Sequence, residues 1–287
     1  MTNTSSMLTF TNPAEMGGHN WRIIGSNRSR RSLITNLTAI LEGFQPISLN
    51  EMDSVALLNR VDHKYVLSFA TLQHTLLALK TEYRVLVVNG NPLNHYRTLY
   101  FDTPGFRLYN NHVNGLAERY KVRSREYLDT HLNYLEVKHK TRKDRTIKKR
   151  LLTQAPLRRV TSEAGKWLDQ FIPWGNDYLE PKTWNTFTRI TLVNLESCER
   201  VTIDVDIAFY NADHISLLEG VAVAEVKQNG HDHLSPFRRM MREQHIPTQS
   251  FSKYCVGTSL VFDSVKKNSI KKTLLQIKRI SEGAQNE

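Results

Sequence analysis

The chain has 287 residues, of which 40% are hydrophobic and 23% charged, so it can bury one substantial core and is not disordered throughout. Its net charge of +11 is concentrated between Ala117 and Arg150, where 12 Lys and Arg stand against 5 Asp and Glu, which favours an anionic ligand. No apolar run spans a bilayer, the first ten residues lack a secretory signal, and there are two cysteines, Cys198 and Cys255, so we expect a soluble protein of a reducing, cytoplasmic compartment.

Three sections are expected along the chain. Residues 1–45 are polar, include the basic run RSRR, and are interpreted as a flexible lead-in. Residues 46–264 carry the periodic patterns of a folded domain, and residues 265–287 form a basic tail. The composition of this tail predicts a solvated helix, and attraction to acidic lipid or to an acidic partner is the alternative.

Short strands dominate the central section. Strands are predicted at 60–68, 83–88, 95–103, 117–127, 132–140, 144–152, 185–194, 199–210 and 221–228. After the first strand, Ser68 can cap a helix in which Leu72, Leu76 and Leu79 recur at helical spacing. Further helices are predicted at 162–172, 235–244 and 250–262. This succession predicts an α+β fold, built on an antiparallel sheet of about eight strands that curls or closes.

The stretch ERYKVRSREY places a cation at every second position, in Arg119, Lys121, Arg123 and Arg125. Side chains alternate between the two faces of a strand, so these four cations share one face. Like charges on one face repel each other, and a bound anion would offset that repulsion. A solvated sheet face, which is the alternative, normally mixes charges of both signs.

Other predicted strands continue this pattern. The residues that share a charged face are Glu136 with Lys138 and Lys140, Lys148 with Arg150, Glu225 with Lys227, and Arg200 with Thr202, Asp204 and Asp206. Opposite the last set, the residues Val201, Ile203, Val205 and Ile207 make an apolar face. Each strand alone fits a solvated surface, but together the strands favour a cavity lined by Lys and Arg.

A lining of Lys and Arg inside a closed sheet of about eight strands suits a chain of phosphates. Glu225, with Glu136 or Asp204 as further candidates, offers the hard oxygen ligands that Mg²⁺ or Mn²⁺ prefers. Nucleic acid is the competing anion, although inward carboxylates would repel a phosphodiester backbone. His231 and His233, which flank Asp232, are a weaker candidate for metal binding.

An ordered series of motifs carries a resemblance to a known family. The motifs are RVDHKY, YFDTPGFRLY, KVRSREY, LEVKHK, FTRITL, RVTIDVDI, AEVKQ and FSKY, and they cover roughly residues 55–262. In this order they resemble the VTC domain of the vacuolar transporter chaperone polyphosphate polymerases, in the triphosphate tunnel metalloenzyme (CYTH-like) superfamily. The resemblance implies an antiparallel β-barrel tunnel that binds a nucleoside triphosphate and a growing polyphosphate chain. It also implies a polymerase in which a metal ion, Mn²⁺ or Mg²⁺, assists transfer of the γ-phosphate.

The resemblance also assigns roles to residues. It implies that the catalytic phosphate ligands are Lys64, Arg123, Arg125, Lys138, Arg189 and Arg200. Further phosphate-binding residues would be His112, Lys121, Lys148 and Lys253. Glu225 matches the metal-binding glutamate of the family, and a surface histidine is the alternative reading of His112.

One residue departs from the family pattern. The tyrosine that the family places two residues before the arginine of FTRITL is Phe187 here, so a phenolic hydrogen bond to phosphate is missing. This departure keeps two alternatives open, a tunnel triphosphatase and a non-catalytic module that binds polyphosphate or inositol phosphates. A membrane-protein partner that recruits the chain to the inner face of a membrane also stays open.

Overall fold

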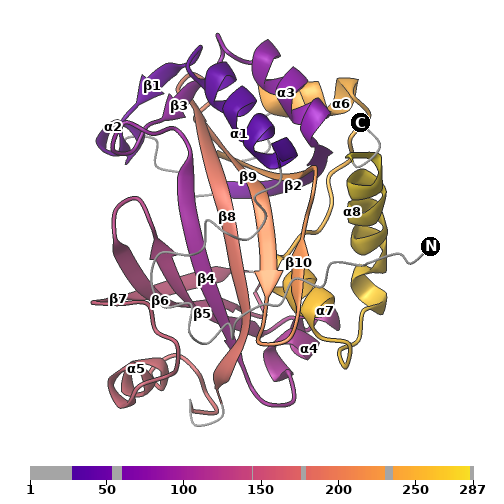
Figure 1. Cartoon of the computed structure of the whole chain (residues 1–287). Helices are drawn as coiled ribbons and strands as arrows, with labels where there is room; N and C mark the ends of the chain where they lie inside the picture. Colours follow the sequence, from indigo (N-terminus) through magenta and orange to yellow (C-terminus); the bar gives the residue numbers. More distant parts are fainter. Residues whose placement is uncertain (1–27, 54–59, 144, 176–178, 230–234, 285–287) are drawn as a thin grey trace, which may run out of the picture.

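The computed structural model describes residues 28–53, 60–143, 145–175, 179–229 and 235–284 (Figure 1). The strands are β1 (Gln45–Ile47), β2 (Arg60–Ser68), β3 (Arg84–Leu86), β4 (Asn94–Asp102), β5 (Arg119–Tyr127), β6 (Leu132–Lys140), β7 (Thr146–Thr153), β8 (Glu180–Asn194), β9 (Glu199–Tyr210), β10 (Ile215–Leu217) and β11 (Val221–Asn229). The helices are α1 (Arg28–Leu41), α2 (Leu49–Asp53), α3 (Phe69–Ala78), α4 (Arg107–Val113), α5 (Ser162–Leu168), α6 (Pro236–Glu243), α7 (Lys253–Val261), the short 3₁₀ helix η3 (Asn268–Ile270) and α8 (Lys271–Ala284). This content confirms the predicted α+β class.

The main strands form one antiparallel sheet in the order β2-β11-β9-β8-β4-β5-β6-β7. Within the described residues, no pairing joins β7 to β2, so the sheet curls without closing. The expectation of a closed barrel is therefore corrected. Closure is prevented at β2 because its outer edge is bonded elsewhere: the carbonyl of Lys64 accepts from the amide of Gln249 at 2.9 Å, and that of Val66 from the side chain of Gln276 at 3.3 Å.

The curl nevertheless brings distant strands close together. In a flat sheet, β9 and β5 would lie about 14 Å apart, because three strand spacings of about 4.8 Å separate them. The side chains of the adjacent residues Ser252 and Lys253 nevertheless contact Lys121 on β5 and Asp204 on β9. The inner face of the sheet is therefore strongly concave.

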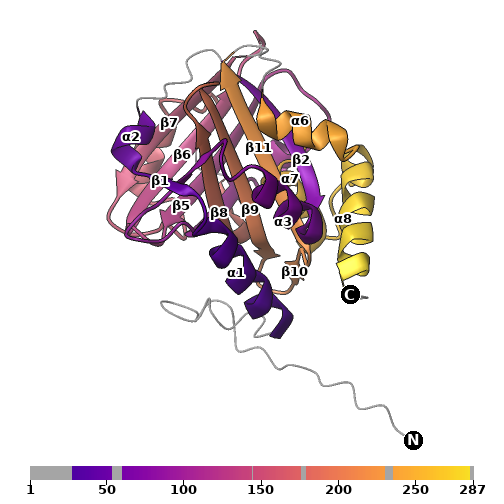
Figure 2. The ribbon, with the colours of Figure 1, turned by 90° about the horizontal axis from the view of Figure 1, so that it is seen from above.

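The outer face of β2, β11, β9 and β8 is covered by α1, α3 and α6 (Figure 2). The predicted helix cap is confirmed, because the hydroxyl of Ser68 accepts a hydrogen bond from the amide of Thr71 at 3.1 Å. Leu72, Leu76 and Leu79 are fully buried in the cluster that joins these helices to the sheet. The buried leucines thus fix one layer of the fold and leave the other face of the strands for charged side chains.

The predicted flexible lead-in, residues 1–45, includes a helix that its polar composition did not predict. Residues 28–41 form α1, and β1 at residues 45–47 pairs in parallel with β3. Leu37 and Leu41 are almost fully buried in the main core cluster. Burial of this apolar stripe stabilises the helix despite its polar flanks, so the expectation of flexibility is wrong for this part of the chain.

A bulge in β9 changes the predicted alternation of faces. The pairing of β8 with β9 shifts register between Thr186 and Thr188, and opposite this shift Asp206 has a φ of 53°. Val205 lies in the outer cluster with α3, whereas Ile207 lies in a different cluster with Phe187. The prediction that Ile207 continues the apolar face of Val201, Ile203 and Val205 is therefore wrong, because the extra residue of the bulge turns the strand over.

The C-terminal tail is a helix, as predicted, but it is not wholly solvated. Ile277 and Thr273 of α8 are buried, and the hydroxyl of Ser281 donates to the carbonyl of Glu219 at 2.9 Å. The helix therefore docks beside β2 and β11 and keeps its lysines outside. In the described part of the chain, none of the helices is long and apolar enough to cross a membrane.

Candidate functional site

The charged residues singled out from the sequence gather on the concave inner face of the sheet. Cross-strand register pairs Lys64 with Glu225 between β2 and β11, and Arg123 with Glu136 between β5 and β6. Residues that pair in this way lie on the same face. The inner face is therefore built from side chains of at least five strands, with α7 at one end.

Glu225 holds two lysines. Its Oε1 lies 2.9 Å from the Nζ of Lys64, and its Oε2 lies 2.8 Å from the Nζ of Lys227. Burial favours the neutral acid, but Lys227 and Lys64 outweigh it and hold the pKa of Glu225 well below its usual range. Glu225 is therefore a carboxylate at neutral pH. Lys227 was not among the predicted site residues, although its spacing two residues from Glu225 could have identified it.

Asp204 holds a second pair of cations. Arg189 donates to its two oxygens at 2.6 and 2.8 Å, and the Nζ of Lys253 contacts Oδ2. Burial opposes ionisation, yet Arg189 and Lys253 lower the pKa of Asp204 to about 2. Burial also lowers the pKa of Lys253 to about 8, with Asp204 acting against this effect. Two strands and a helix therefore meet at one buried carboxylate.

The position of Lys253 depends on the start of α7. The hydroxyl of Ser252 caps this helix by accepting from the amide of Cys255 at 3.3 Å, and the phenol of Tyr254 donates to the buried carboxylate of Asp102. Gly257 lies so close to Phe209 that an added Cβ would clash with its ring. The helix therefore packs tightly on β9, which fixes Lys253 at the inner face.

Glu136 holds a third pair of cations. Arg123 donates to its Oε2 at 2.6 Å through Nε, and the Nζ of Lys148 contacts Oε1. Burial again favours the neutral acid, but Arg123, Arg125 and Lys148 lower the pKa of Glu136 to about 2. The carboxylates of Glu225, Asp204 and Glu136 thus each organise two cations.

Arg125 is held by aromatic rings. Its guanidinium lies 5.7 Å from the ring of Tyr96 and 5.8 Å from that of Phe187, and its Nε donates to the hydroxyl of Thr98 at 3.3 Å. Tyr96 and Phe187 stack with their rings 3° from parallel. Within the described residues, no carboxylate forms an ion pair with Arg125. Phe187 therefore supplies a cation–π contact in place of the missing phenol, a role that the sequence did not reveal.

Lys121 and Lys138 lie opposite each other on β5 and β6. Burial lowers the pKa of both, that of Lys121 to about 7. The Nζ of Lys121 donates to the hydroxyl of Ser252 at 3.0 Å, and in the described part of the chain neither lysine has a carboxylate within ion-pair distance. These lysines are therefore cations whose charge the neighbouring side chains do not neutralise.

Two further predicted phosphate ligands are His112, on α4, and Arg200, on β9. Burial, assisted by Lys121 and Arg119, lowers the pKa of His112 on α4 to about 2, so this histidine is neutral at pH 7 and does not act as a basic residue. Arg200 lies opposite Lys227 in register, where its Nη2 lies 3.4 Å from the carbonyl oxygen of Met52 on α2. Arg200 therefore lies beside the pair of Lys227 and Glu225 and apart from Asp204.

The side chains fit a divalent ion only as part of a phosphate complex. Among the described residues, no group of three or more His, Cys, Asp or Glu side chains comes together. Magnesium is commonly held by one or two carboxylates, with phosphate oxygens and water completing its shell. Glu225 suits that role, and a metal there would displace at least one lysine. His231, Asp232 and His233 lie outside the described residues.

Comparison with protein families matches residues 59–262 to the VTC domain. Comparison with curated proteins finds no match. Among solved structures, a candidate adenylate cyclase from Vibrio parahaemolyticus is 15% identical over 69% of this chain and 97% of its own, with a TM-score of 0.40. A candidate adenylyl cyclase from Hippeastrum, described as having a dominant triphosphatase activity, is 14% identical over 71% and 97%, with a TM-score of 0.44. These two likenesses are too distant to transfer an activity.

Proposed function

The chain belongs to the VTC domain family, and from this premise we propose that it is a metal-dependent polyphosphate polymerase. It transfers the γ-phosphate of a nucleoside triphosphate, with ATP as the first candidate, to the end of a polyphosphate chain. The family match supports a ligand of the triphosphate class. Synthesis of a polyphosphate chain, as opposed to hydrolysis of the triphosphate, is the more specific part of the proposal.

One observation supports this function above the others. On β5 and β6, Lys121, Arg125 and Lys138 face inward with no carboxylate partner among the described residues. Unpaired cations on a concave surface carry a cost that an extended polyanion removes. Glu225 on β11 and Asp204 on β9 lie elsewhere on the inner face, each with two cations, which is the combination that a triphosphate with a metal would need.

The proposed chemistry requires positioning more than a strong base. The attacking group is a terminal phosphate oxygen that is already ionised, so no side chain has to remove a proton from it. Arg123, Arg125 and Lys138 would align the acceptor chain, while Arg189 and Lys253 would hold the donor. Glu225 would hold a divalent ion, which when bound would neutralise charge on the phosphate oxygens.

A tunnel triphosphatase is the second candidate, and the opening strand distinguishes the two. Tunnel triphosphatases commonly carry Glu-x-Glu-x-Lys there, whereas β2 has Arg60, Asp62 and Lys64. Fewer inward carboxylates favour retention of a polyanionic product over its release. A non-catalytic binding module would not need Glu225, so its presence on the inner face favours an enzyme.

Incubation of the purified protein with ATP and Mn²⁺ tests the proposal. We expect an acid-stable polymer that binds basic dyes and lengthens with time. Because many charge contacts act together, long polyphosphate should bind more tightly than tripolyphosphate, and its affinity should fall steeply as salt rises. Release of free phosphate alone, at every metal concentration, would replace the polymerase with a triphosphatase. A membrane-protein partner that receives the product is part of the same proposal.

A further inference from the structure

The two end strands of the sheet differ in how their outer edges are treated. The edge of β2 is covered, because the backbone of residue 249 and the side chain of Gln276 on α8 both donate to its carbonyls. β7 is the other end strand, and in the part of the chain that the structure describes, β6 is its sole strand partner. An exposed edge presents amides and carbonyls that can pair with another strand.

The composition of β7 limits what can pair with this edge. The strand reads TIKKRLLT, so it carries three consecutive cations and no acidic residue. All of its residues are exposed or half-buried, including Ile147 at 45% and Leu152 at 61%. Charged edge strands discourage pairing with uncharged strands, whereas these cations attract an acidic one.

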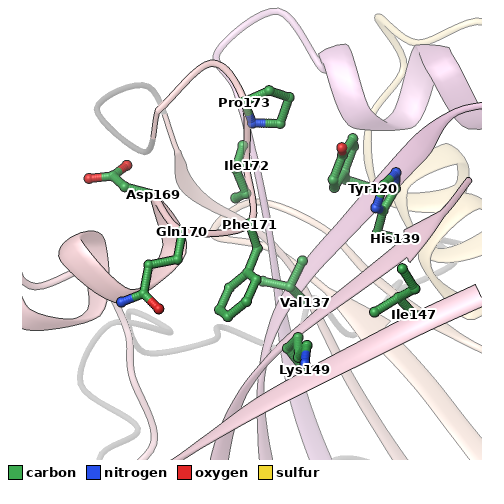
Figure 3. A pocket seen from close by; sticks show the side chains of 10 residues that line it. All are labelled: Tyr120, Val137, His139, Ile147, Lys149, Asp169, Gln170, Phe171, Ile172 and Pro173. Atoms are coloured by element: carbon green, nitrogen blue, oxygen red, sulfur yellow. The ribbon is translucent and has the colours of Figure 1, made fainter.

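A pocket of about 350 Å³ opens beside the same strand, on the face away from the candidate site (Figure 3). Ile147 and Lys149 of β7 line it together with Val137 of β6. The opposite wall comes from the turn after α5, where Phe171 points toward Val137. The pocket therefore offers an apolar floor beside the outer edge of β7, and its polar lining includes Lys149, Asp169 and Gln170.

Aromatic rings support the floor of this pocket. Tyr120 and His139 stack with centroids 4.1 Å apart, and Trp174 packs edge-on against Tyr120 at 4.8 Å. The Nε2 of His139 lies 3.0 Å from Glu118, which fixes the orientation of the imidazole ring. A cavity of this size with an apolar floor accommodates an aromatic or aliphatic side chain.

We propose that β7 and this pocket together form a docking site for an extended acidic segment of a partner protein. The segment adds to the sheet as a strand beside β7 and places one aromatic or aliphatic side chain in the pocket. Its acidic residues lie on the inner-face side of the sheet, beside Arg150; Lys148 is on the same side but is already paired with Glu136. This is strand addition, in which the backbone provides affinity and alternate side chains provide specificity. The inference does not depend on the reaction that the inner face performs.

A second copy of this chain is a poor occupant of the same edge. Two antiparallel β7 strands related by a twofold axis at Lys149 would place Lys148 opposite Arg150 and Lys149 opposite its own copy. Like charges in direct cross-strand pairs are destabilising. Charge complementarity therefore favours an acidic partner.

The test titrates the full chain with a fluorescent peptide of sequence Glu-Val-Glu-Phe-Glu-Val-Glu and follows its anisotropy. The methylated peptide and the protein variants below distinguish binding at β7 from binding of the glutamates elsewhere on the inner face. We expect saturable binding and slower hydrogen exchange of the β7 amides. Methylation of the alternate peptide amides that face β7 should abolish binding without changing charge. A peptide with lysine in place of glutamate should not bind.

Matched protein variants locate the peptide. Phe171→Ala, in the wall of the pocket, and Arg150→Ser, on the face that receives the peptide's glutamates, should each weaken binding by about tenfold. Lys272→Ser removes the same charge from the exposed side of α8 and should have no effect. If a variant fails to fold, circular dichroism will show it, and the methylated peptide still tests the edge on the unaltered chain.

Three results would overturn the proposal. These are absence of saturable binding, equal binding of the methylated peptide, and equal loss of affinity in Arg150→Ser and Lys272→Ser. Anionic lipid vesicles and a single-stranded oligonucleotide serve as competitors. Displacement of the peptide by either at a lower concentration than unlabelled peptide would assign the edge to that class of ligand.

Discussion

The inner face contains two regions that differ in whether carboxylates pair with their cations. In the paired region, on β2, β11, β9, β8 and α7, Glu225 and Asp204 each bind two cations. In the open region, on β5 and β6, Lys121, Arg125 and Lys138 have no carboxylate partner among the described residues, and Glu136 is the inward carboxylate that neutralises Arg123. The two regions lie on one concave surface. Before a ligand binds, carboxylates neutralise the cations of the paired region, whereas most cations of the open region have no such partner among the described residues.

This difference indicates that the two regions are suited to different ligands. Carboxylates keep the cations of the paired region in place without ligand, but they also reduce the positive charge that a phosphate encounters. Within the described residues no carboxylate pairs with Lys121 or Arg125 of the open region, so burial penalises the charged forms of both until an anion binds. The paired region is therefore suited to a metal with a triphosphate, and the open region to a chain of phosphates. Four predictions test this comparison.

Loss of Asp204 should have the largest effect. Asp204→Asn leaves Arg189 and Lys253 buried without their carboxylate, which should lower the free energy of unfolding by about 3–5 kcal/mol. The pKa of Asp204 is about 2, so in the natural chain this stabilisation is present above about pH 4 and is lost as the pH falls toward 2. Urea unfolding at pH 7 measures the change.

The control for this variant is Asp263→Asn, which removes an exposed partner of Lys267 and should cost less than about 1 kcal/mol. Tripolyphosphate should restore part of the stability of Asp204→Asn by replacing the missing negative charge. Equal destabilisation in the two variants would show that Asp204 does not organise the paired region.

Glu225→Gln should impair the reaction more than it impairs binding. The amide keeps the shape but cannot hold a hard divalent ion, so we expect turnover in Mn²⁺ to fall by a factor on the order of 100. Tripolyphosphate binding without metal should persist or tighten, because Lys64 and Lys227 are released. Glu282→Gln on α8 is the matched control. Unchanged turnover across a Mn²⁺ titration would place the metal elsewhere.

Arg125→Ala should weaken tripolyphosphate binding by about 1.5–3 kcal/mol, the usual contribution of a charged hydrogen bond. Arg123→Ala should also weaken binding, but less, because Glu136 already neutralises Arg123. Calorimetry at fixed salt measures both. A larger loss for Arg123→Ala would contradict the view that unpaired cations contribute most to anion binding.

The smallest expected effect is a pH dependence of binding. Burial lowers the pKa of Lys121 to about 7, so this lysine is largely neutral at pH 8, and a bound anion would draw a proton back onto it. Affinity for tripolyphosphate should therefore fall by about tenfold or less as the pH rises from 7 to 9. Calorimetry in buffers of different ionisation enthalpy should detect proton uptake that Lys121→Met reduces. Absence of uptake would mean that Lys121 does not contact the anion.

Much of the fold follows from local patterns. The alternation of side chains along the chain predicted β6 and β9 with the bounds that the structure has. The spacing of Leu72, Leu76 and Leu79 identified the buried face of the helix that includes α3. Alternation also identified which face of each strand carries charge, because the side-chain period of a strand is a local property. The same rule failed at Asp206, since a bulge depends on the register with the neighbouring strand.

The sequence by itself therefore determined the family, the α+β class and the alternation that puts charged side chains on one face of each strand. The tertiary structure decided which carboxylate holds which cation, since Asp204 meets Lys253 from 49 residues away. It also decided that Phe187 lies beside Arg125 and that burial removes the charge of His112. Contacts, burial and edges arise only when distant segments pack together, and no local pattern encodes them.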